Sequence, residues 1–147
     1  MSKLIAVSLI LLALTAESCS HSPYLIVFIF PTNFRGTAKI LGNRPLGIRP
    51  DRVESKITLK FPESGILEIQ DELPTLKWHS TVAMYESGEK FPTDADADPN
   101  AIPDDNQIAL RSAGVKGNSE DWFVVGTKAD LKHTMDEKRG FKFSPEK

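Results

Sequence analysis

The sequence predicts an all-β protein: a single small β-sandwich of the immunoglobulin or transthyretin type, with one short C-terminal helix. Short segments rich in β-branched and aromatic residues mostly follow a period of two, as strands do. Gly- and Pro-containing turns separate these segments. A helix start signal appears only late in the chain, at Thr127. About seven short strands with turns between them favour a sandwich.

The first predicted strand, residues 24–30, is a continuous apolar run that stops at Pro31. Such a run indicates a strand covered on both faces. Seven residues bracketed by Pro23 and Pro31 are too few to cross a membrane. Residues 31–36 then predict a turn, and residues 37–41 a returning strand.

A hairpin is predicted next. Ile57, Leu59 and Phe61 alternate with polar residues, so they share the dry face of one strand. Residues 62–65, Pro-Glu-Ser-Gly, supply the chemistry of a tight turn. We therefore expect residues 66–69 to return as the second arm of the hairpin.

A longer strand follows and ends at a tight turn around Gly88. Its inward side is predicted to be formed by four residues, with His79 on the opposite face: Leu76, Trp78, Val82 and Met84. Residues 107–111 and 121–125 are the last predicted strands.

The C-terminal helix is predicted from Thr127 to Lys138. Thr127 and Asp130 form the pattern of a capping box, with Asp in the reciprocal position. Leu131 and Met135 lie four residues apart and would dock the helix on the sheet. Docking is required because so short a helix is marginal alone in water.

Residues 1–18 have the features of a signal peptide: Lys3, an eleven-residue apolar run, and the small residues Ala16 and Ser18 before Cys19. The apolar run would rise about 16 Å as a helix, well short of a ~30 Å hydrocarbon core. The segment that ends at Cys19 is similar to a lipobox, apart from Glu17.

Cys19 is therefore the predicted lipid attachment site, and residues 19–23 form a tether. The chain has no other cysteine, so no intramolecular disulfide is possible, and acylation explains an unpaired thiol in an exported chain. The alternative is an ordinary signal peptide cut after Ala16 or Ser18, which leaves a bare thiol. The predicted location is the bacterial cell envelope, on the extracytoplasmic side, and the outer membrane in a Gram-negative cell because Ser20 follows the cysteine.

Removal of residues 1–18 from the 147 leaves 129, enough for one domain over residues 24–147. The chain has 18 basic and 20 acidic residues, a net charge of −2. Nucleic-acid binding calls for a clustered basic excess, so this class of partner is excluded.

Four segments together resemble an uncharacterised domain found in bacterial lipoproteins and other exported proteins. The first is the apolar strand with the Pro-x-Asn-Phe-x-Gly turn, residues 24–36. The others are residues 61–67, the Trp78-His79 pair and residues 122–127. That family carries no established activity, so the resemblance implies an exported β-domain and no catalytic residues.

The acidic, Pro-rich loop at residues 92–106 is the sharpest candidate for chemistry. Asp94, Asp96 and Asp98 occupy positions one, three and five of a calcium-loop pattern, and Asp105 position twelve. Position six is Pro99, where the pattern requires Gly. A solvated loop without a metal is the alternative reading.

Other chemistry has little support. His21, His79 and His133 do not have metal-ligand spacing, and nothing resembles a nucleophile elbow. Trp78 and Trp122 are expected in the core rather than on an exposed binding platform. The prediction is a non-enzymatic, cofactor-free module held to the membrane by its lipid, with an envelope protein or polysaccharide as partner. The alternatives are a Ca²⁺-responsive module and a small hydrolase.

Overall fold

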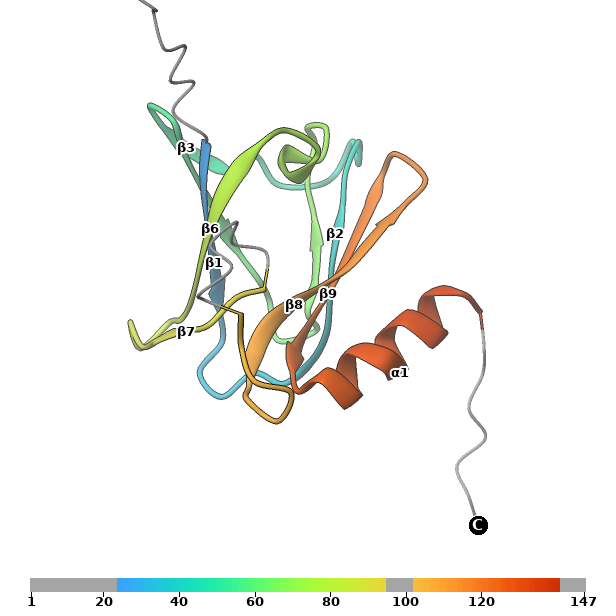
Figure 1. The fold of residues 1–147 in the computed structure, drawn as a ribbon. Helices are drawn as coiled ribbons and strands as arrows, with labels where there is room; N and C mark the ends of the chain where they lie inside the picture. Colours follow the sequence, from blue (N-terminus) through green and yellow to red (C-terminus); the bar gives the residue numbers. More distant parts are fainter. Residues whose placement is uncertain (1–23, 95–101, 141–147) are drawn as a thin grey trace, which may run out of the picture.

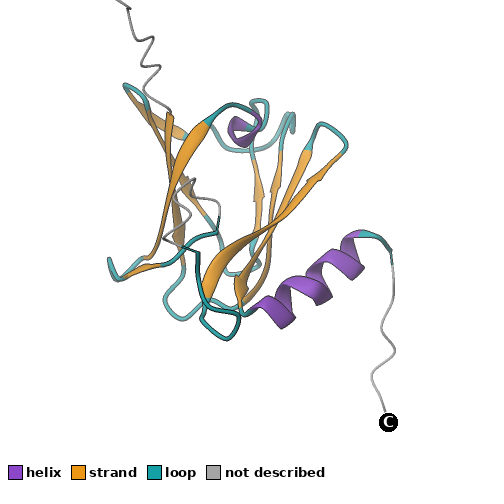
Figure 2. Cartoon of the chain, viewed as in Figure 1, coloured by secondary structure: helices purple, strands orange, loops and turns teal. Residues whose placement is uncertain are grey.

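The computed structural model describes residues 24–94 and 102–140 of the chain. They form two facing β-sheets with a helix outside the second sheet (Figures 1 and 2). The first sheet has the order β3-β4-β1-β6-β7 and the second β5-β2-β9-β8. The strands of the first sheet are β1 (Tyr24–Phe30), β3 (Asp51–Val53), β4 (Lys56–Lys60), β6 (His79–Tyr85) and β7 (Lys90–Phe91). Those of the second are β2 (Gly36–Leu41), β5 (Ile66–Glu68), β8 (Ala109–Lys116) and β9 (Glu120–Gly126).

The all-β class with one short helix is confirmed, but the immunoglobulin or transthyretin type is not. β1 pairs in parallel with both β4 and β6, and β2 pairs in parallel with β5. Immunoglobulin sandwiches are built from antiparallel sheets. Parallel neighbours require connections that cross between the sheets, which turn signals in the sequence do not reveal.

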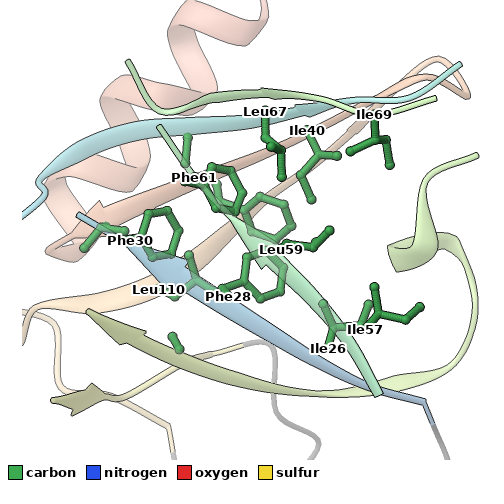
Figure 3. Close-up of a cluster of buried hydrophobic side chains, with 14 of the residues drawn as sticks. Ile26, Phe28, Phe30, Ile40, Ile57, Leu59, Phe61, Leu67, Ile69 and Leu110 are labelled. Carbon is green, nitrogen blue, oxygen red and sulfur yellow. The ribbon is translucent and has the colours of Figure 1, made fainter. Parts of the chain in front are cut away.

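The core lies between the two sheets and is rich in aromatic rings (Figure 3). The ring centroids of Phe30 and Phe61 are 4.5 Å apart. Phe28 of the first sheet meets Phe123 of the second edge to face, at 5.1 Å. The predicted inward face of residues 57–61 is confirmed, because Ile57, Leu59 and Phe61 are all buried.

The predicted hairpin over residues 56–69 is wrong. β4 belongs to the first sheet, whereas β5 belongs to the second and pairs with β2. Gly65, with φ of +71°, lies at the turn where the chain crosses between sheets. Likewise β2 does not return beside β1 but crosses to the second sheet. After each crossing the chain continues in the facing sheet, so consecutive strands contribute apolar side chains to the same core from its two sides.

The predicted inward face of residues 76–84 is also wrong. Pro74 begins a 3₁₀ turn, η1 (Pro74–Leu76), and the strand starts only at His79. The buried residues of β6 are Thr81, Ala83 and Tyr85, the alternate set to the one predicted. Trp78 therefore precedes the strand and is 73% exposed. The prediction counted residues 76–84 as one alternating strand. Because the 3₁₀ turn occupies the start of that range, the alternation begins only in β6, where the odd-numbered residues face the core.

The helix α1 (Lys128–Lys138) has the predicted capping box, in which the Thr127 amide donates to the Asp130 carboxylate at 2.8 Å. It packs against β8 and β9. Contrary to expectation, its only buried side chain is Thr134, whose hydroxyl lies 3.0 Å from that of Thr37. Leu131 and Met135 are only half-buried, so the face of α1 that meets the sheet is centred on Thr134 rather than on these two residues.

Within the described residues, no helix has the length and apolar character needed to cross a membrane.

Candidate functional site: a groove at the open seam

The two sheets are joined along one side, here called the sealed seam (residues 92–94 with Leu110). Beyond β7, Thr93 pairs with Leu110 of β8. The Leu110 amide donates to the Pro92 carbonyl at 2.8 Å, and the Asp94 amide donates to the Leu110 carbonyl at 3.0 Å. Continuous backbone hydrogen bonding therefore links the first sheet to the second on this side.

The opposite side, here called the open seam (between residues 60–63 and β5), has no such closure within the part of the chain that the structure describes. Pairing between β3 and β4 extends only as far as Asp51 opposite Thr58, so β3 does not cover Lys60. From the loop that borders this side, the described hydrogen bond to β5 is that of the Ile48 amide, which donates to the Glu68 carbonyl at 2.9 Å. The Ile48 carbonyl in turn accepts from Gln70 at 2.9 Å.

A groove of about 660 Å³ lies along the open seam. This volume is in the range of ligand-binding clefts. Its apolar rim is exposed: Leu46 is 97%, Ile48 50% and Ile66 43% accessible. Clustered exposed apolar side chains of this size are typical of interaction sites. The floor is formed by residues that belong to the core or its edge, among them Pro31, Phe61 and Leu67.

The backbone of β5 faces the groove with unused hydrogen-bonding groups. The Gly65 carbonyl and the Ile69 amide bond to β2. Alternate residues of a strand bond to the same side, so Ile66 and Glu68 direct their backbone groups toward the seam. The Ile66 amide is capped by the Ser64 hydroxyl at 3.3 Å. In the described structure, the Ile66 carbonyl and the Glu68 amide have no recorded partner.

The groove is acidic. Four charged residues line it: Lys60, Glu63, Glu68 and Glu86. Lys60 and Glu86 form an ion pair at 3.0 Å. One positive and three negative charges leave a net charge of −2, carried by Glu63 and Glu68, for which the described residues provide no ion-pair partner.

Gly47 sets the shape of the rim. A Cβ atom at this position would lie 2.7 Å from the backbone carbon of Ile69. Only glycine lets the loop approach β5 this closely. The sequence analysis missed the groove because its rim is a loop. The available signal was the pair of apolar residues, Leu46 and Ile48, in a segment otherwise made of turn residues.

The predicted calcium ligands are only partly described. Asp96 and Asp98 lie outside the described residues, as does Pro99. Asp94 accepts a hydrogen bond from the Ser112 amide at 2.9 Å. Asp105 forms an ion pair with Lys128 at 3.1 Å. In the described ranges no three acidic, His or Cys side chains are grouped as metal ligands. Calcium binding therefore stays a prediction.

Burial raises the pKa of Asp94, and the Ser112 amide and the Arg111 guanidinium oppose this rise. Arg111 is buried, and its guanidinium donates to the carbonyls of Gly126, Asp104 and Gln107. The sequence analysis did not single it out. Arg111 fixes the end of the acidic loop and brings a positive charge to Asp94, which disfavours a second cation there.

The remaining predicted residues do not converge on a site. Cys19 and His21 lie outside the described residues. His79 lies with Nδ1 2.7 Å from the Lys77 carbonyl oxygen, and His133 is on the exposed surface of α1. Trp122 is buried as predicted, but on the helix side of the second sheet, with the Lys39 amine 3.6 Å from its ring centroid.

Asp121 of β9 is a buried acid that the sequence analysis did not single out as a site residue. Burial raises its pKa, and the nearby Thr75 hydroxyl is the largest effect that opposes the rise.

No family model matches this sequence. A search of curated proteins likewise gives no match. Among solved structures, the fold is similar to a crystal structure from Bacillus anthracis described as a "Putative Lipoprotein", with a TM-score of 0.47 and 12% sequence identity over 82% of each chain. A likeness this distant carries no argument about function.

Proposed function

We propose that this protein is a non-enzymatic, lipid-anchored module of the bacterial cell envelope that binds an extended peptide segment in the groove of the open seam. The observation that carries the proposal is the outward-facing backbone of β5, bordered by exposed Leu46 and Ile66 and by the unpaired carboxylates of Glu63 and Glu68.

Backbone geometry supports an extended occupant. A peptide strand beside β5 would donate to the Ile66 carbonyl and accept from the Glu68 amide. Adding a strand to an exposed sheet edge is a common mode of peptide recognition, in which main-chain bonds give affinity and side-chain pockets give specificity. Ile48 already makes one residue of such pairing, in parallel with Ile69.

Charge and polarity support the composition of the peptide. The rim offers apolar contacts at Leu46 and Ile66, and Glu63 and Glu68 leave a local charge of −2. A segment that alternates basic and apolar side chains complements both features, because alternate residues of a strand point to opposite faces. Complementary charge also selects against acidic segments.

Membrane anchoring is supported by the sequence before the domain: an apolar leader followed by a small-residue segment and Cys19. Palmitate labelling of cells that produce the wild-type chain or Cys19→Ser tests this part. Incorporation should occur in the wild type only, and equal labelling of both would reject the anchor. Stable retention requires more than one acyl chain, which bacterial lipoproteins have.

The binding proposal is tested with a fluorescent heptapeptide of alternating lysine and valine, titrated with the full-length protein and followed by anisotropy. Glu68→Pro removes the amide that faces the groove, and proline is tolerated on an edge strand. Because Glu68→Pro also removes the carboxylate, its matched comparison is Glu68→Gln, and relative to that variant we expect about tenfold weaker binding, the equivalent of one backbone hydrogen bond. Glu68→Gln keeps the amide and should weaken binding only about threefold.

Two controls keep the result interpretable. Glu89→Gln removes an exposed charge at the β6–β7 turn, outside the groove, and should bind like the wild type. Leu46→Ser removes an apolar side chain that is 97% exposed without changing the charge of the groove, so it should fold normally and still lose affinity. Equal affinity for a glutamate–valine heptapeptide, or unchanged binding by Leu46→Ser and Glu68→Pro, would contradict the proposal.

A further inference from the structure

We infer that the end of the domain that carries Tyr24 and Trp78, here called the aromatic end (Tyr24, Val53, Leu76 and Trp78), rests on the phospholipid surface, with both aromatic rings in the interfacial layer. This inference rests on the proposed lipid anchor at Cys19 and adds to it an orientation of the domain on the membrane.

The length of the tether limits which surface can reach the bilayer. Cys19 precedes Tyr24 by five residues. Fully extended, they span at most about 17 Å. β1 then runs away from Tyr24 for seven residues, or roughly 23 Å. The Tyr24 end of the first sheet therefore stays within about 17 Å of an acylated Cys19, whereas the Phe30 end has no such short link to the bilayer.

Strand register brings the exposed apolar side chains to this one end. Tyr24 is paired with His79, the residue directly after Trp78. Val53 is paired with Lys56, which in turn is paired with Leu25. Figure 1 shows the start of β1, the β3–β4 turn and the start of β6 at the same end of the first sheet.

The apolar side chains of the aromatic end are exposed to an extent that is typical of an interaction surface. Trp78 is 73% and Tyr24 39% accessible, and Val53 and Leu76 are also exposed. Trp and Tyr are the residues enriched at membrane–water interfaces, where the ring is apolar and the polar atom stays hydrated. Trp122, on the other sheet, is only 5% exposed. Exposure of a tryptophan is thus specific to the tether end.

Charges at the aromatic end nearly cancel. Arg52 pairs with Asp71 at 3.5 Å. Lys56 and Lys77 form no ion pair within the described ranges, but Glu54 lies in the β3–β4 turn near Lys56, and Glu72 lines the same hollow as Lys77. The attraction to the bilayer therefore comes from ring burial rather than from anionic lipid. Docking should depend little on salt or on the phosphatidylglycerol content.

The test uses the full-length, lipidated protein in phosphatidylethanolamine–phosphatidylglycerol vesicles, with a fraction of the lipid brominated on the upper acyl carbons. Bromine quenches tryptophan only at short range. In a Trp122→Phe background, the emission of Trp78 should be lost on bromination, and 0.5 M salt should not restore it. In the matched Trp78→Phe variant, the emission of Trp122 should be unaffected by the brominated lipid.

The outcomes separate the inference from the anchor. Palmitate incorporation together with unquenched Trp78 would overturn the docking and leave the anchor intact. Absence of palmitate would overturn both. Quenching that disappears in high salt would also contradict the inference, because ring burial is not screened by ions. Quenching of both tryptophans would mean that the domain is not oriented by its aromatic end.

Discussion

The two seams between the facing sheets differ in how their strand edges are covered. At the sealed seam, residues 92–94 bond to Leu110, a side chain with no accessible surface. At the open seam, Ile48 makes the one backbone hydrogen bond from the described loop to β5, and Leu46 nearby is 97% exposed. Exposed sheet edges invite pairing with other chains, and proteins normally cover them. The same fold covers one seam and leaves the other open, which is why we place binding at the open one.

The largest expected effect concerns leucine at the two seams. Leu110→Ala should reduce the free energy of unfolding by about 2–5 kcal/mol, because it leaves a cavity in the core at the sealed seam. Leu46→Ala should change it by less than about 0.5 kcal/mol, as exposed substitutions do. Urea unfolding of both variants measures the difference. Similar losses would mean that the open seam is packed like the sealed one.

The second prediction concerns the loop that forms the groove rim. Gly47→Ala puts a methyl group 2.7 Å from the Ile69 backbone, so the loop must move away from β5. We expect a loss of about 1–3 kcal/mol in unfolding free energy, as for other overpacked sites. The amide of Ile48 should also exchange faster with solvent, because its bond to Glu68 is weakened. An unchanged urea midpoint would show that the rim does not depend on this contact.

The third prediction is a pH dependence at the sealed seam. Burial raises the pKa of Asp94, so its ionised form destabilises the folded state. Stability linked to this group should therefore rise as the pH falls from neutral through the raised folded pKa. Asp94→Asn keeps an oxygen acceptor for the Ser112 amide and removes the charge. Its melting temperature should exceed that of the wild type at pH 7, and the difference should shrink toward pH 4.

The opposite trend, with wild type and Asp94→Asn diverging as the pH falls, would show that the ionised carboxylate is stabilising. That result would favour Asp94 as a cation ligand. The measurement is a pair of melting curves at each pH.

The smallest effect expected is that of calcium on the sealed seam. Asp94 bonds to the Ser112 amide and faces Arg111, and Asp105 pairs with Lys128. Arg111 and Lys128 already place positive charge beside these carboxylates, which disfavours a further cation, so millimolar Ca²⁺ should leave the melting temperature unchanged. A clear rise would contradict this prediction and support the calcium hypothesis, since a ligand of the native state must stabilise it.

Local features of the fold could be predicted from the sequence, and pairings could not. The run at residues 24–30, the alternation at residues 57–61 and the capping box at Thr127 depend on neighbours along the chain. Partner strands depend on contacts between distant segments. The turn at residues 62–65 was recognisable, but β5 returns beside β2 rather than β4 because the chain crosses the core there.

The site was harder to predict than the fold for a related reason. Leu46 and Ile48 lie in a loop, where apolar residues carry no periodic signal. Trp78 was expected in the core, and the 3₁₀ turn at Pro74 places it outside the strand. The groove rim and the aromatic end both consist of apolar residues that the fold leaves exposed. Composition alone does not distinguish such residues from those of the core.

The most direct test of the account is amide hydrogen exchange at Glu68 and Leu110 in the full-length protein, with and without the lysine–valine heptapeptide. The account predicts that Leu110, bonded to Pro92, is protected in both conditions. Glu68 should exchange rapidly in the protein alone and become protected when the peptide is added. A Glu68 amide that is already as protected as Leu110, or one that the peptide leaves unchanged, would contradict a binding edge at the open seam.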